Sequence, residues 1–392
     1  MLKLEISERI KNLQQELTNQ RLDCYIVASE DNIWYLSGIT YKPEERPFFI
    51  LITPGEKPVL IVPKLEERHL KKVIIDCEIM TYWDYPSPAG NNWYDILEKA
   101  IRGFTRIGVE ENIKSNILKK ICIGETIQTD LLNNLRKVKS PFEIEMIRRT
   151  AKISDEAMGR IKKSAYYGAS VVEMFSLSKS IQKELIKNKE FDPVTTSLLT
   201  AVWPAPVSSM PHSIPDLSDR LNKGPNVAMC YFRINGYAAE CERTFFIGKP
   251  STEVREHFNH MINARKSALS VLKAGAKCSD VDYEAKNYLV KSGYINNLLH
   301  RTGHGIGLGN HEEPWIALGN EEVLKENMVI SIEPGIYIEE LGGYRHSDTI
   351  LITKDGYQFL TNYPSGIEDM IISGSNIPAR IKGYIMRKIL KL

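Results

Sequence analysis

The spacing of hydrophobic residues changes along this chain, and each spacing predicts a different element. Over residues 4–19 apolar side chains recur at helical spacing, which predicts an amphipathic helix. Short runs rich in Ile, Val and Phe follow, separated by turn signals such as Pro54-Gly55, and these runs predict strands. The predicted strands cover residues 24–28, 47–53, 58–62 and 106–109, with a helix over 65–72. Strands that alternate with helices indicate an α/β domain.

A polar, basic stretch at about residues 131–140 predicts the end of this first domain. Directly after it, Ser140-Pro141-Phe142-Glu143 has the form of a helix start, with a Ser cap, Pro at the first helical position and Glu at the third. A second capping box at Ser170 predicts a helix to about Ile186. Further helices are predicted over residues 254–272 and 281–291, the latter capped by Ser279, and strands over 226–231, 237–247, 328–332 and 349–353.

These patterns divide the chain into three predicted parts. Residues 1–135 form an α/β domain, residues 136–365 form an α+β domain, and residues 366–392 form a basic tail. In the tail, Lys and Arg residues surround Ile381, Ile385 and Ile389, which predicts a basic amphipathic helix. Such a helix either binds a membrane surface or a partner, or it packs on its own protein.

Composition narrows the class of protein. With 392 residues, 43% hydrophobic and 26% charged, the chain is an ordinary globular protein. A net charge of +2 and the lack of a basic stripe interleaved with aromatic residues argue against nucleic acid as a partner. No apolar run approaches the roughly 18 residues that span a bilayer. Six scattered cysteines, and an amphipathic N-terminal segment that carries acids, lead us to expect a reduced, cytoplasmic protein.

Two carboxylates lie on the predicted strand at residues 237–247, with one residue between them. Glu240 and Glu242 lie two positions apart, so they share one face at a spacing of roughly 6.6 Å. Such a pair repels, binds a cation or shares a proton, unless the strand is a solvated edge. A hairpin with the preceding strand brings Met229 and Tyr231 close to Glu240, and a methionine offers no ligand to a hard metal ion.

Histidines and a further glutamate gather in the second half of the chain. His304 lies in a glycine-flanked turn, where the backbone can come close to a ligand, with His300 and His311 nearby. His212 stands in a loop ahead of the hairpin, and Glu333 lies in a short apolar segment. Buried groups of these kinds are costly and are therefore often functional. Arg345 and Asp348, in a glycine-rich turn, are candidates for a structural ion pair.

These segments resemble the pita-bread hydrolase family, which includes prolidase, aminopeptidase P, methionine aminopeptidase and creatinase. The motifs are His-Arg-Thr-Gly-His-Gly-Ile-Gly-Leu at 300–308, Ile-Glu-Pro-Gly-Ile-Tyr-Ile at 332–338 and Arg-Thr-Phe-Phe-Ile-Gly at 243–248. The resemblance spans residues 140–364 and is looser in the N-terminal domain. It implies an α+β protein in which a creatinase-type α/β N-terminal domain precedes a C-terminal pita-bread domain, and it implies a homodimer.

Metallopeptidases of that family bind two metal ions through Asp, Asp, His, Glu and Glu. In this chain the position of the first Asp is Met229, the second is Glu240, and the last Glu is Ser347. His304 and Glu333 match the remaining two positions. The resemblance therefore implies that the two-metal centre, which activates a bridging water, does not assemble.

In site chemistry the chain is similar to creatinase, the metal-independent branch of the family. The shared features are a histidine before the hairpin, here His212, the segment Glu242-Arg243-Thr244, and a Gly-Gly-Tyr-Arg turn that ends at Arg345. His346-Ser347 departs from the creatinase pattern, as does the lack of an arginine in residues 311–314. These differences argue against creatine as the substrate, and no cofactor is expected.

The sequence thus predicts hydrolysis of a C–N bond in a small amide, amidine or guanidino compound. The predicted catalytic residues are His212, as general base and then acid, and Glu242 and Glu333, which stabilise charge. A covalent variant with Glu242 as the nucleophile stays open. The predicted substrate-binding residues are Glu240, His304, His311, Arg345 and His346.

Two alternatives remain open. One is an Xaa-Pro dipeptidase or aminopeptidase with a single divalent metal ion (Mn, Co, Zn or Fe), held by Glu240, His304 and Glu333 with or without His346. The other is a non-enzymatic, peptide-binding pita-bread protein. The expected partners are a small-molecule or dipeptide substrate and a second copy of the chain.

Overall fold

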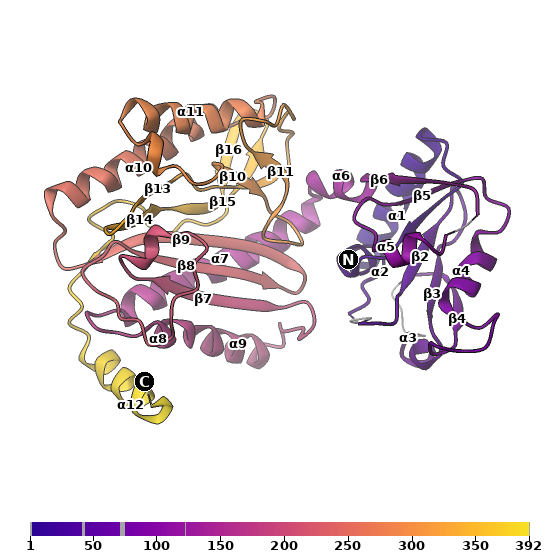
Figure 1. Ribbon diagram of the computed structural model, residues 1–392, viewed down its shortest axis with the longest axis horizontal. Coiled ribbons are helices and arrows are strands. Elements are labelled where there is room, and N and C mark those ends of the chain that lie inside the picture. The colour runs from indigo at the N-terminus through magenta and orange to yellow at the C-terminus, as the bar shows by residue number, and fades with distance from the viewer. Residues whose placement is uncertain (1, 41–43, 71–74, 122, 392) are drawn as a thin grey trace. The chain divides into compact units, whose positions relative to one another are not determined.

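The computed structural model describes residues 2–40, 44–70, 75–121 and 123–391 (Figure 1). The chain divides into two compact units, Met1–Arg136 and Lys137–Leu392. Among the helices within these described ranges, none has the length and hydropathy of a membrane span.

The first unit is built on one mixed six-stranded sheet, in the order β4-β3-β2-β1-β5-β6. β1 pairs antiparallel with β2 and parallel with β5, and every residue of β1 and β2 is buried. The elements are α1 (Leu2–Asn19), β1 (Cys24–Val27), α2 (Glu30–Ser37), β2 (Phe49–Ile52), β3 (Val59–Pro63), η1 (Lys64–Glu66), α3 (Glu67–Leu70), β4 (Glu78–Tyr82), α4 (Trp93–Ile101), β5 (Arg106–Glu110), α5 (Ser115–Leu118), β6 (Glu125–Thr129) and α6 (Leu131–Lys137).

The second unit contains a nine-stranded sheet and a separate two-stranded one, β13-β14. The main path of the large sheet is β11-β10-β12-β15-β9-β8-β7, with β16 added to β15 and β17 to β9. Its strands are β7 (Ser197–Trp203), β8 (Asn226–Ile234), β9 (Tyr237–Ile247), β10 (Gly303–Gly305), β11 (Glu312–Ile316), β12 (Val329–Ile332), β13 (Gly335–Ile338), β14 (Gly342–Arg345), β15 (Ser347–Thr353), β16 (Gly356–Phe359) and β17 (Ile371–Ile372).

Helices share one apolar core with this sheet. Residues of α7, α10 and α11 pack in a single cluster with Cys230, Phe232 and Cys241 of β8 and β9. Because strand side chains alternate between faces, the neighbouring positions of the same strands face away from this core. The helices are α7 (Pro141–Ser164), α8 (Val171–Phe175), α9 (Leu177–Lys187), α10 (Thr252–Ser270), α11 (Cys278–Lys291) and α12 (Ile377–Leu390), with 3₁₀ turns η2 (Val207–Ser209) and η3 (Ile295–Asn297).

Several predicted element boundaries differ from the structure. The α7 capping box is present, because Ser140 accepts from the Glu143 amide and the Glu143 carboxylate accepts from the Ser140 amide. The helix predicted from Ser170 is interrupted at Ser176, giving α8 and α9. The N-cap of α11 is Lys277 rather than Ser279, and the stretch in which the first domain was predicted to end contains α6. Positions 71 and 72 of the predicted helix over 65–72 lie outside the described residues.

The predicted tail helix is present as α12, and one side of it packs against its own domain. Arg387 donates from Nη1 to the Tyr166 hydroxyl over 2.9 Å and pairs with Glu173, while Gly383 is buried. Figure 1 shows α12 beside α8, the helix that carries Glu173. Ile381, by contrast, is 57% exposed on α12. Of the alternatives left open for the tail, packing on its own protein is the one that these contacts support.

Candidate active site

A cavity of about 390 Å³ lies on the face of the large sheet opposite the helical core. Strands β8 and β9 supply its floor, and their register pairs Met229 with Glu242 and Tyr231 with Glu240. All four side chains line the cavity, as the alternation of the strands predicted. Glu240 and Glu242 are only 2% and 3% exposed, so their carboxylates are out of bulk water.

His304 is buried against the acidic residues of the floor. Its Nε2 is 3.3 Å from Glu333 Oε1 and 3.6 Å from Glu240 Oε1, and it has no hydrogen-bond partner among the described residues. Its Nδ1 lies 3.0 Å from the Gly305 carbonyl oxygen, an acceptor, which directs Nε2 toward the acids. Burial opposes a charge on the imidazole, but the two carboxylates raise the pKa of His304 to about 9.

The glycines beside His304 are required by close strand packing. A Cβ on Gly303 would lie 1.9 Å from the Ser331 carbonyl oxygen, and one on Gly305 would lie 2.2 Å from the Glu313 carbonyl oxygen. Both contacts are with backbone, which cannot move aside cheaply. The motif therefore holds the β10 backbone tightly between β11 and β12 and fixes the position of the imidazole.

Ser347 occupies the position beside Glu240 where the metallopeptidase pattern has a glutamate. Its hydroxyl donates to Glu240 Oε1 over 2.7 Å and lies 2.8 Å from the Ser331 hydroxyl. Burial raises the pKa of Glu240, and the negative charge of Glu333 adds to that effect. On the other side, the Met229 thioether faces Glu242 across the hairpin.

Arg345 neutralises Glu242. Its guanidinium donates from Nε and Nη2 to the two carboxylate oxygens over 2.5 and 2.9 Å, a bidentate pair. Burial still raises the pKa of Glu242 to about 7, even though Arg345 lowers it. The carboxylate is therefore occupied by an internal cation, which does not fit the predicted roles of Glu242 as a substrate clamp or nucleophile.

A hydrogen-bond chain leads outward from this ion pair. Arg345 donates from Nη1 to the Tyr337 hydroxyl over 3.0 Å, and that hydroxyl lies 2.7 Å from His300 Nε2. His300 Nδ1 lies 2.6 Å from the Arg301 carbonyl oxygen, so Nδ1 carries the proton and Nε2 accepts from Tyr337. The chain holds the guanidinium in one orientation.

The mouth of the cavity carries two more histidines. His212 and His311 both line it and both are exposed. The loop of His212 is tied to β7, because the Trp203 indole donates to the Ser213 carbonyl oxygen over 2.7 Å. The His311 ring stacks on His304 with centroids 3.8 Å apart, and burial together with the charge of His304 lowers the pKa of His311 to about 4.

His346 is not brought to the cavity, contrary to its predicted role in substrate binding. Its ring is fully buried and packs edge-on against Phe258, with ring centroids 5.1 Å apart. Burial lowers the pKa of His346 well below the ordinary range, so the imidazole is neutral. The reason is the alternation around β15, which turns the side chains of Arg345 and Ser347 toward the pocket and that of His346 away.

The predicted ion pair between Arg345 and Asp348 is also absent. Asp348 instead pairs with Arg243 over 2.8 Å and with Arg265 over 2.6 Å, on the side away from the cavity. Two contributors were missed from the sequence: Arg301, which lines the cavity, and Tyr337, which binds Arg345. Arg301 lies in the motif at 300–308 and Tyr337 in the motif at 332–338, from which only the histidines and the glutamate were chosen as candidates. Their place in these motifs was the feature of the sequence that could have identified them.

The remaining side chains fit one metal ion better than two. Ligand atoms of Glu240, His304 and His311 all lie within 4.8 Å of one another, and Glu333 is in contact with His304. His304 Nε2 lies 3.3 Å from Glu333 and 3.6 Å from Glu240 without a hydrogen-bond partner among the described residues, and in its unprotonated form it would offer a lone pair to a metal ion. A second ion would need oxygen ligands where Met229 and Ser347 stand, and a thioether is a poor ligand for hard cations.

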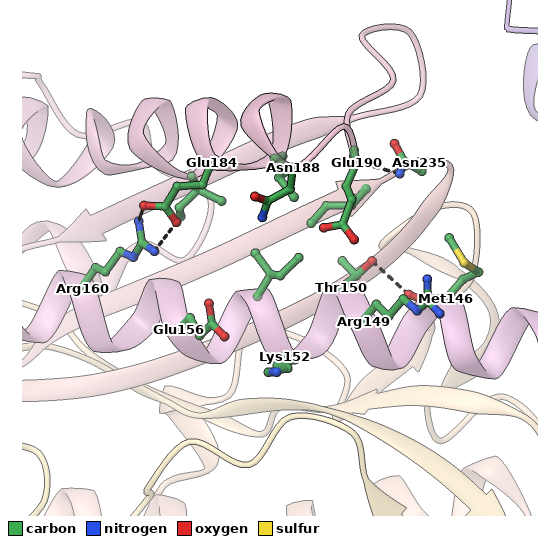
Figure 2. A pocket seen from close by; sticks show the side chains of 14 residues that line it. Met146, Arg149, Thr150, Lys152, Glu156, Arg160, Glu184, Asn188, Glu190 and Asn235 are labelled. Atoms are coloured by element: carbon green, nitrogen blue, oxygen red, sulfur yellow. Dashed lines mark hydrogen bonds and ion pairs between the residues drawn. The ribbon is translucent and has the colours of Figure 1, made fainter.

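A second hollow, of about 340 Å³, lies on the surface between α7 and α9 (Figure 2). Figure 2 shows Arg160 reaching Glu184, which it contacts at 2.5 Å, with Arg149, Lys152 and Glu156 along α7. No histidine or cysteine is among the residues that line it. Acidic and basic groups compensate one another there, so it lacks the chemistry of the first cavity.

Comparison with known proteins identifies the family and the relatives that this chain resembles. The profile described as Metallopeptidase family M24 matches residues 145–354, and that of the Creatinase/Prolidase N-terminal domain matches residues 9–138. An uncharacterized peptidase of Staphylococcus aureus strain MRSA252 is 31% identical over 366 residues, which cover 91% of this chain and 99% of that protein.

Solved structures agree with these matches. The prolidase from Pyrococcus horikoshii OT3 has a TM-score of 0.76 and 28% identity, over 92% of this chain and 99% of that one. The Xaa-Pro dipeptidase from Bacillus anthracis has a TM-score of 0.79 over 94% of this chain and 100% of that one. Its identity of 24% supports a shared fold alone.

Proposed function

Because the chain belongs to metallopeptidase family M24, and is accordingly a hydrolase of C–N bonds, we propose that it cleaves such a bond in a small amide, amidine or guanidino substrate without a two-metal centre. Members of the family typically use divalent metal ions. The proposal places this chain in site chemistry near the metal-independent, creatinase-like branch. It depends on the residues that stand where a pair of ions would be held.

The observation that carries the proposal is the replacement of two oxygen ligands on the cavity floor. Met229 faces Glu242 from β8, and Ser347 donates a hydrogen bond to Glu240. The hydrogen bond from Ser347 occupies one oxygen of the Glu240 carboxylate. A Glu240 that held two metal ions would need both of its oxygens. The floor keeps three carboxylates against the cationic His304 and Arg345, so it still favours a positively charged or N–H-rich group.

In the proposed reaction His212 takes a proton from water as the water attacks the substrate carbon. His212 then returns this proton to the leaving nitrogen as the C–N bond breaks. Burial opposes ionisation of Glu333, but contact with His304 and the charge of Arg345 lower its pKa to about 2, so it is an anion that attracts the substrate. Arg345 lines the cavity and is assigned the stabilisation of charge on a substrate oxygen, with the buried, cationic His304 acting from behind the floor.

One observation favours a second candidate, an Xaa-Pro dipeptidase or aminopeptidase with one divalent ion (Mn, Co, Zn or Fe). The buried Nε2 of His304 has no hydrogen-bond partner in the described part of the chain, while Glu240 and Glu333 lie close to it. Three protein ligands suit a catalytic single-ion site, where the ion would polarise the scissile carbonyl. Solved structures named prolidase and Xaa-Pro dipeptidase share the fold.

Metal analysis of protein purified without chelator separates the candidates. The proposal predicts well below one equivalent of metal per chain, and unchanged rates on N-methylguanidino compounds, cyclic amidines or Xaa-Pro dipeptides after chelation. About one equivalent, with activity lost on chelation, supports the second candidate. Two equivalents of metal per chain, with activity that depends on this metal, would contradict the proposal, because Met229 and Ser347 should prevent the binding of two ions.

A matched variant sharpens this test. Met229→Asp combined with Ser347→Glu restores the two missing oxygen ligands in their own positions. Titration with Mn²⁺ should then show more bound ions in the double variant than in the unaltered protein. Equal binding by both proteins would show that these two positions do not control metal binding.

Two further proposals come from the resemblance and the composition. The chain is proposed to be a homodimer, which light scattering of the purified protein tests. It is also proposed to act in the reducing cytoplasm, as its scattered cysteines suggest. Of the described cysteines, all are free thiols and Cys24, Cys230, Cys241 and Cys278 are buried.

A further inference from the structure

Helix α12 packs on its own domain with the side that an amphipathic helix usually turns to solvent. Ala379 packs against the core cluster of the second unit, and a Cβ on Gly383 would collide with the Glu173 carboxylate. Arg387 pairs with Glu173 on the same side of the helix. In most globular proteins the apolar stripe of a surface helix faces the core. In α12 the side that faces the core is instead made of small and charged residues.

The large apolar side chains of α12 lie on its other side. Because an α-helix has 3.6 residues per turn, the exposed residues Ile377, Ile381, Tyr384, Ile385 and Ile389 fall within an arc of about 140°. We call these five side chains the apolar stripe of α12. Ile377 is 67% and Ile389 is 74% exposed, so the stripe meets solvent along the whole helix, at the edge of the second unit (Figure 1). A contiguous exposed stripe of this kind marks an interaction surface.

Positive charge surrounds the apolar stripe. Residues 377–392 contain no acidic residue and five basic ones, which are Arg380, Lys382, Arg387, Lys388 and Lys391. By helical position, Lys382 borders one edge of the stripe, Arg380 and Lys391 border the other, and Lys388 lies within it. Within the part of the chain that the structure describes, only Arg387 of these five lies within ion-pair distance of a carboxylate. The protein therefore leaves the charge on the exposed side of α12 uncompensated.

An aliphatic stripe bordered by unpaired basic residues is complementary to the surface of an anionic bilayer. The isoleucines can enter the boundary between head groups and acyl chains, while the lysine side chains extend toward the phosphates. A helix of 14 residues is about 21 Å long, which is too short to span the hydrocarbon core, so α12 would lie in the plane of the surface. A second copy of the chain is a poorer occupant, because it would bring an equally basic helix against this one.

We propose that α12 is a surface anchor that holds the protein reversibly on membranes that contain anionic lipids. The apolar stripe enters the interface, while Ala379, Gly383 and Arg387 keep the helix attached to the second unit. The two attachments use opposite sides of the helix, so membrane binding leaves the packing of α12 on its own domain intact. The anchor is independent of the cavity and of the reaction proposed for it.

Sedimentation of the full chain with lipid vesicles tests the anchor. One set of vesicles is phosphatidylcholine alone, and the other is an equal mixture of phosphatidylcholine and phosphatidylserine. We expect the unaltered protein to bind the mixed vesicles roughly tenfold or more tightly than the neutral ones, because each basic residue near the surface gains from the anionic lipids. Added salt should release the protein from the mixed vesicles, since it screens that attraction.

Two double variants separate the apolar from the electrostatic contribution. Ile381→Ser with Ile385→Ser should weaken binding to the mixed vesicles by roughly a hundredfold, because two side chains no longer enter the apolar boundary. Lys382→Gln with Lys388→Gln should weaken it by about tenfold to thirtyfold and should lower the preference for anionic vesicles. All four side chains are exposed, so the urea denaturation midpoint should stay unchanged in both variants.

Matched controls carry the same substitutions elsewhere in the chain. Ile186→Ser with Ile295→Ser alters two isoleucines of similar exposure, in α9 and η3. Lys325→Gln with Lys354→Gln removes two exposed lysines of the second unit. Both control variants should bind the two sets of vesicles as the unaltered protein does.

Four results would overturn the proposal. These are no binding of the unaltered protein to the mixed vesicles, equal binding to neutral and mixed vesicles, an equal loss of binding in the control variants, and unchanged binding in either α12 variant. Light scattering of Ile381→Ser with Ile385→Ser tests the other occupant. If this variant turns a dimer into a monomer and still binds vesicles, the stripe is an interface between two copies and the proposal is wrong.

Discussion

Strands β9 and β15 bury charged side chains on both of their faces, but the two faces satisfy them differently. On the side away from the cavity, Arg243 donates to Asp348 and to the carbonyl oxygens of Glu242, Ser347, Tyr363 and Pro364. Asp348 accepts in addition from Arg265 and from Thr361. Around Arg243 and Asp348, burial is compensated by internal hydrogen bonds.

On the cavity side the compensation is incomplete. Glu242 is bonded by Arg345, but His304 Nε2 has no hydrogen-bond partner among the described residues, although Glu333 and Glu240 lie 3.3 and 3.6 Å from it, and Arg301 has no acid within ion-pair distance there. Both faces are equally deep, since Arg243 is 1% and His304 is 0% exposed. Burial of a charge therefore does not by itself identify a site. Buried atoms without a hydrogen-bond partner, such as Arg265 Nε and His346 Nδ1, also occur on the other face, so what identifies the site is that its polar groups lie at a cavity.

The largest effect is expected from a substitution on the side away from the cavity, where Arg243 and Asp348 are paired. Arg243→Met leaves Asp348 with one of its two arginines and leaves four backbone carbonyl oxygens without their donor. Removing one partner of a buried pair costs about 3–5 kcal/mol, so we expect the free energy of unfolding to fall by that amount. Urea denaturation followed by circular dichroism measures the loss, and a change below about 1 kcal/mol would refute the structural role assigned to Arg243.

On the cavity side, His212→Ala should have the opposite profile. The side chain is exposed, so stability should stay within about 0.5 kcal/mol. Loss of a general acid–base group should lower kcat/KM by roughly 10²–10⁴-fold. The same denaturation assay and a rate assay on a cleaved substrate provide the two readings. Unchanged rates would remove His212 from the proposed mechanism.

A smaller effect is expected at Asp155, which borders the compensated face. Burial raises its pKa from the ordinary 3.8 to about 6, partly offset by the Asn362 amide, and the charge of Asp348 adds to the rise. The folded chain thus keeps a proton that the unfolded chain releases first, so stability falls as the pH rises from about 4 to 6. Asp155→Asn should remove this decline and, after allowance for solvent screening, stabilise the protein by about 1 kcal/mol above pH 6.

Denaturation midpoints at several pH values between 4 and 7 test this prediction. The gain from Asp155→Asn should become small near pH 4 and vanish below it, where the aspartate becomes protonated in the unfolded chain as well as in the folded one. A gain of equal size at every pH would show that the effect comes from something other than titration of the carboxyl. The exposed Asp216, whose pKa is lowered by hydrogen bonds from Ser218, provides a control of opposite sign in Asp216→Asn, which should not stabilise the protein as the pH rises.

The sequence by itself determined the fold class, and the comparisons confirm it as a creatinase-type N-terminal domain followed by a pita-bread domain. It also placed Glu240 and Glu242 on one face, with Met229 and Tyr231 opposite them, because the period of a strand is fixed at two residues. The absence of two family ligands was likewise visible in the chain alone.

Tertiary structure decided how the charges pair. The pairing of Arg345 with Glu242 and of Asp348 with Arg243 joins positions about a hundred residues apart, and no local pattern selects between them. Strands β10, β13 and β14 are short and contain glycine, so their sequences show no alternation of apolar and polar residues. For this reason the sequence predicted neither the burial of His346 nor the position of Arg301 on the cavity wall. Alternation fixes which residues share a face, but only the packing of distant strands determines what that face meets.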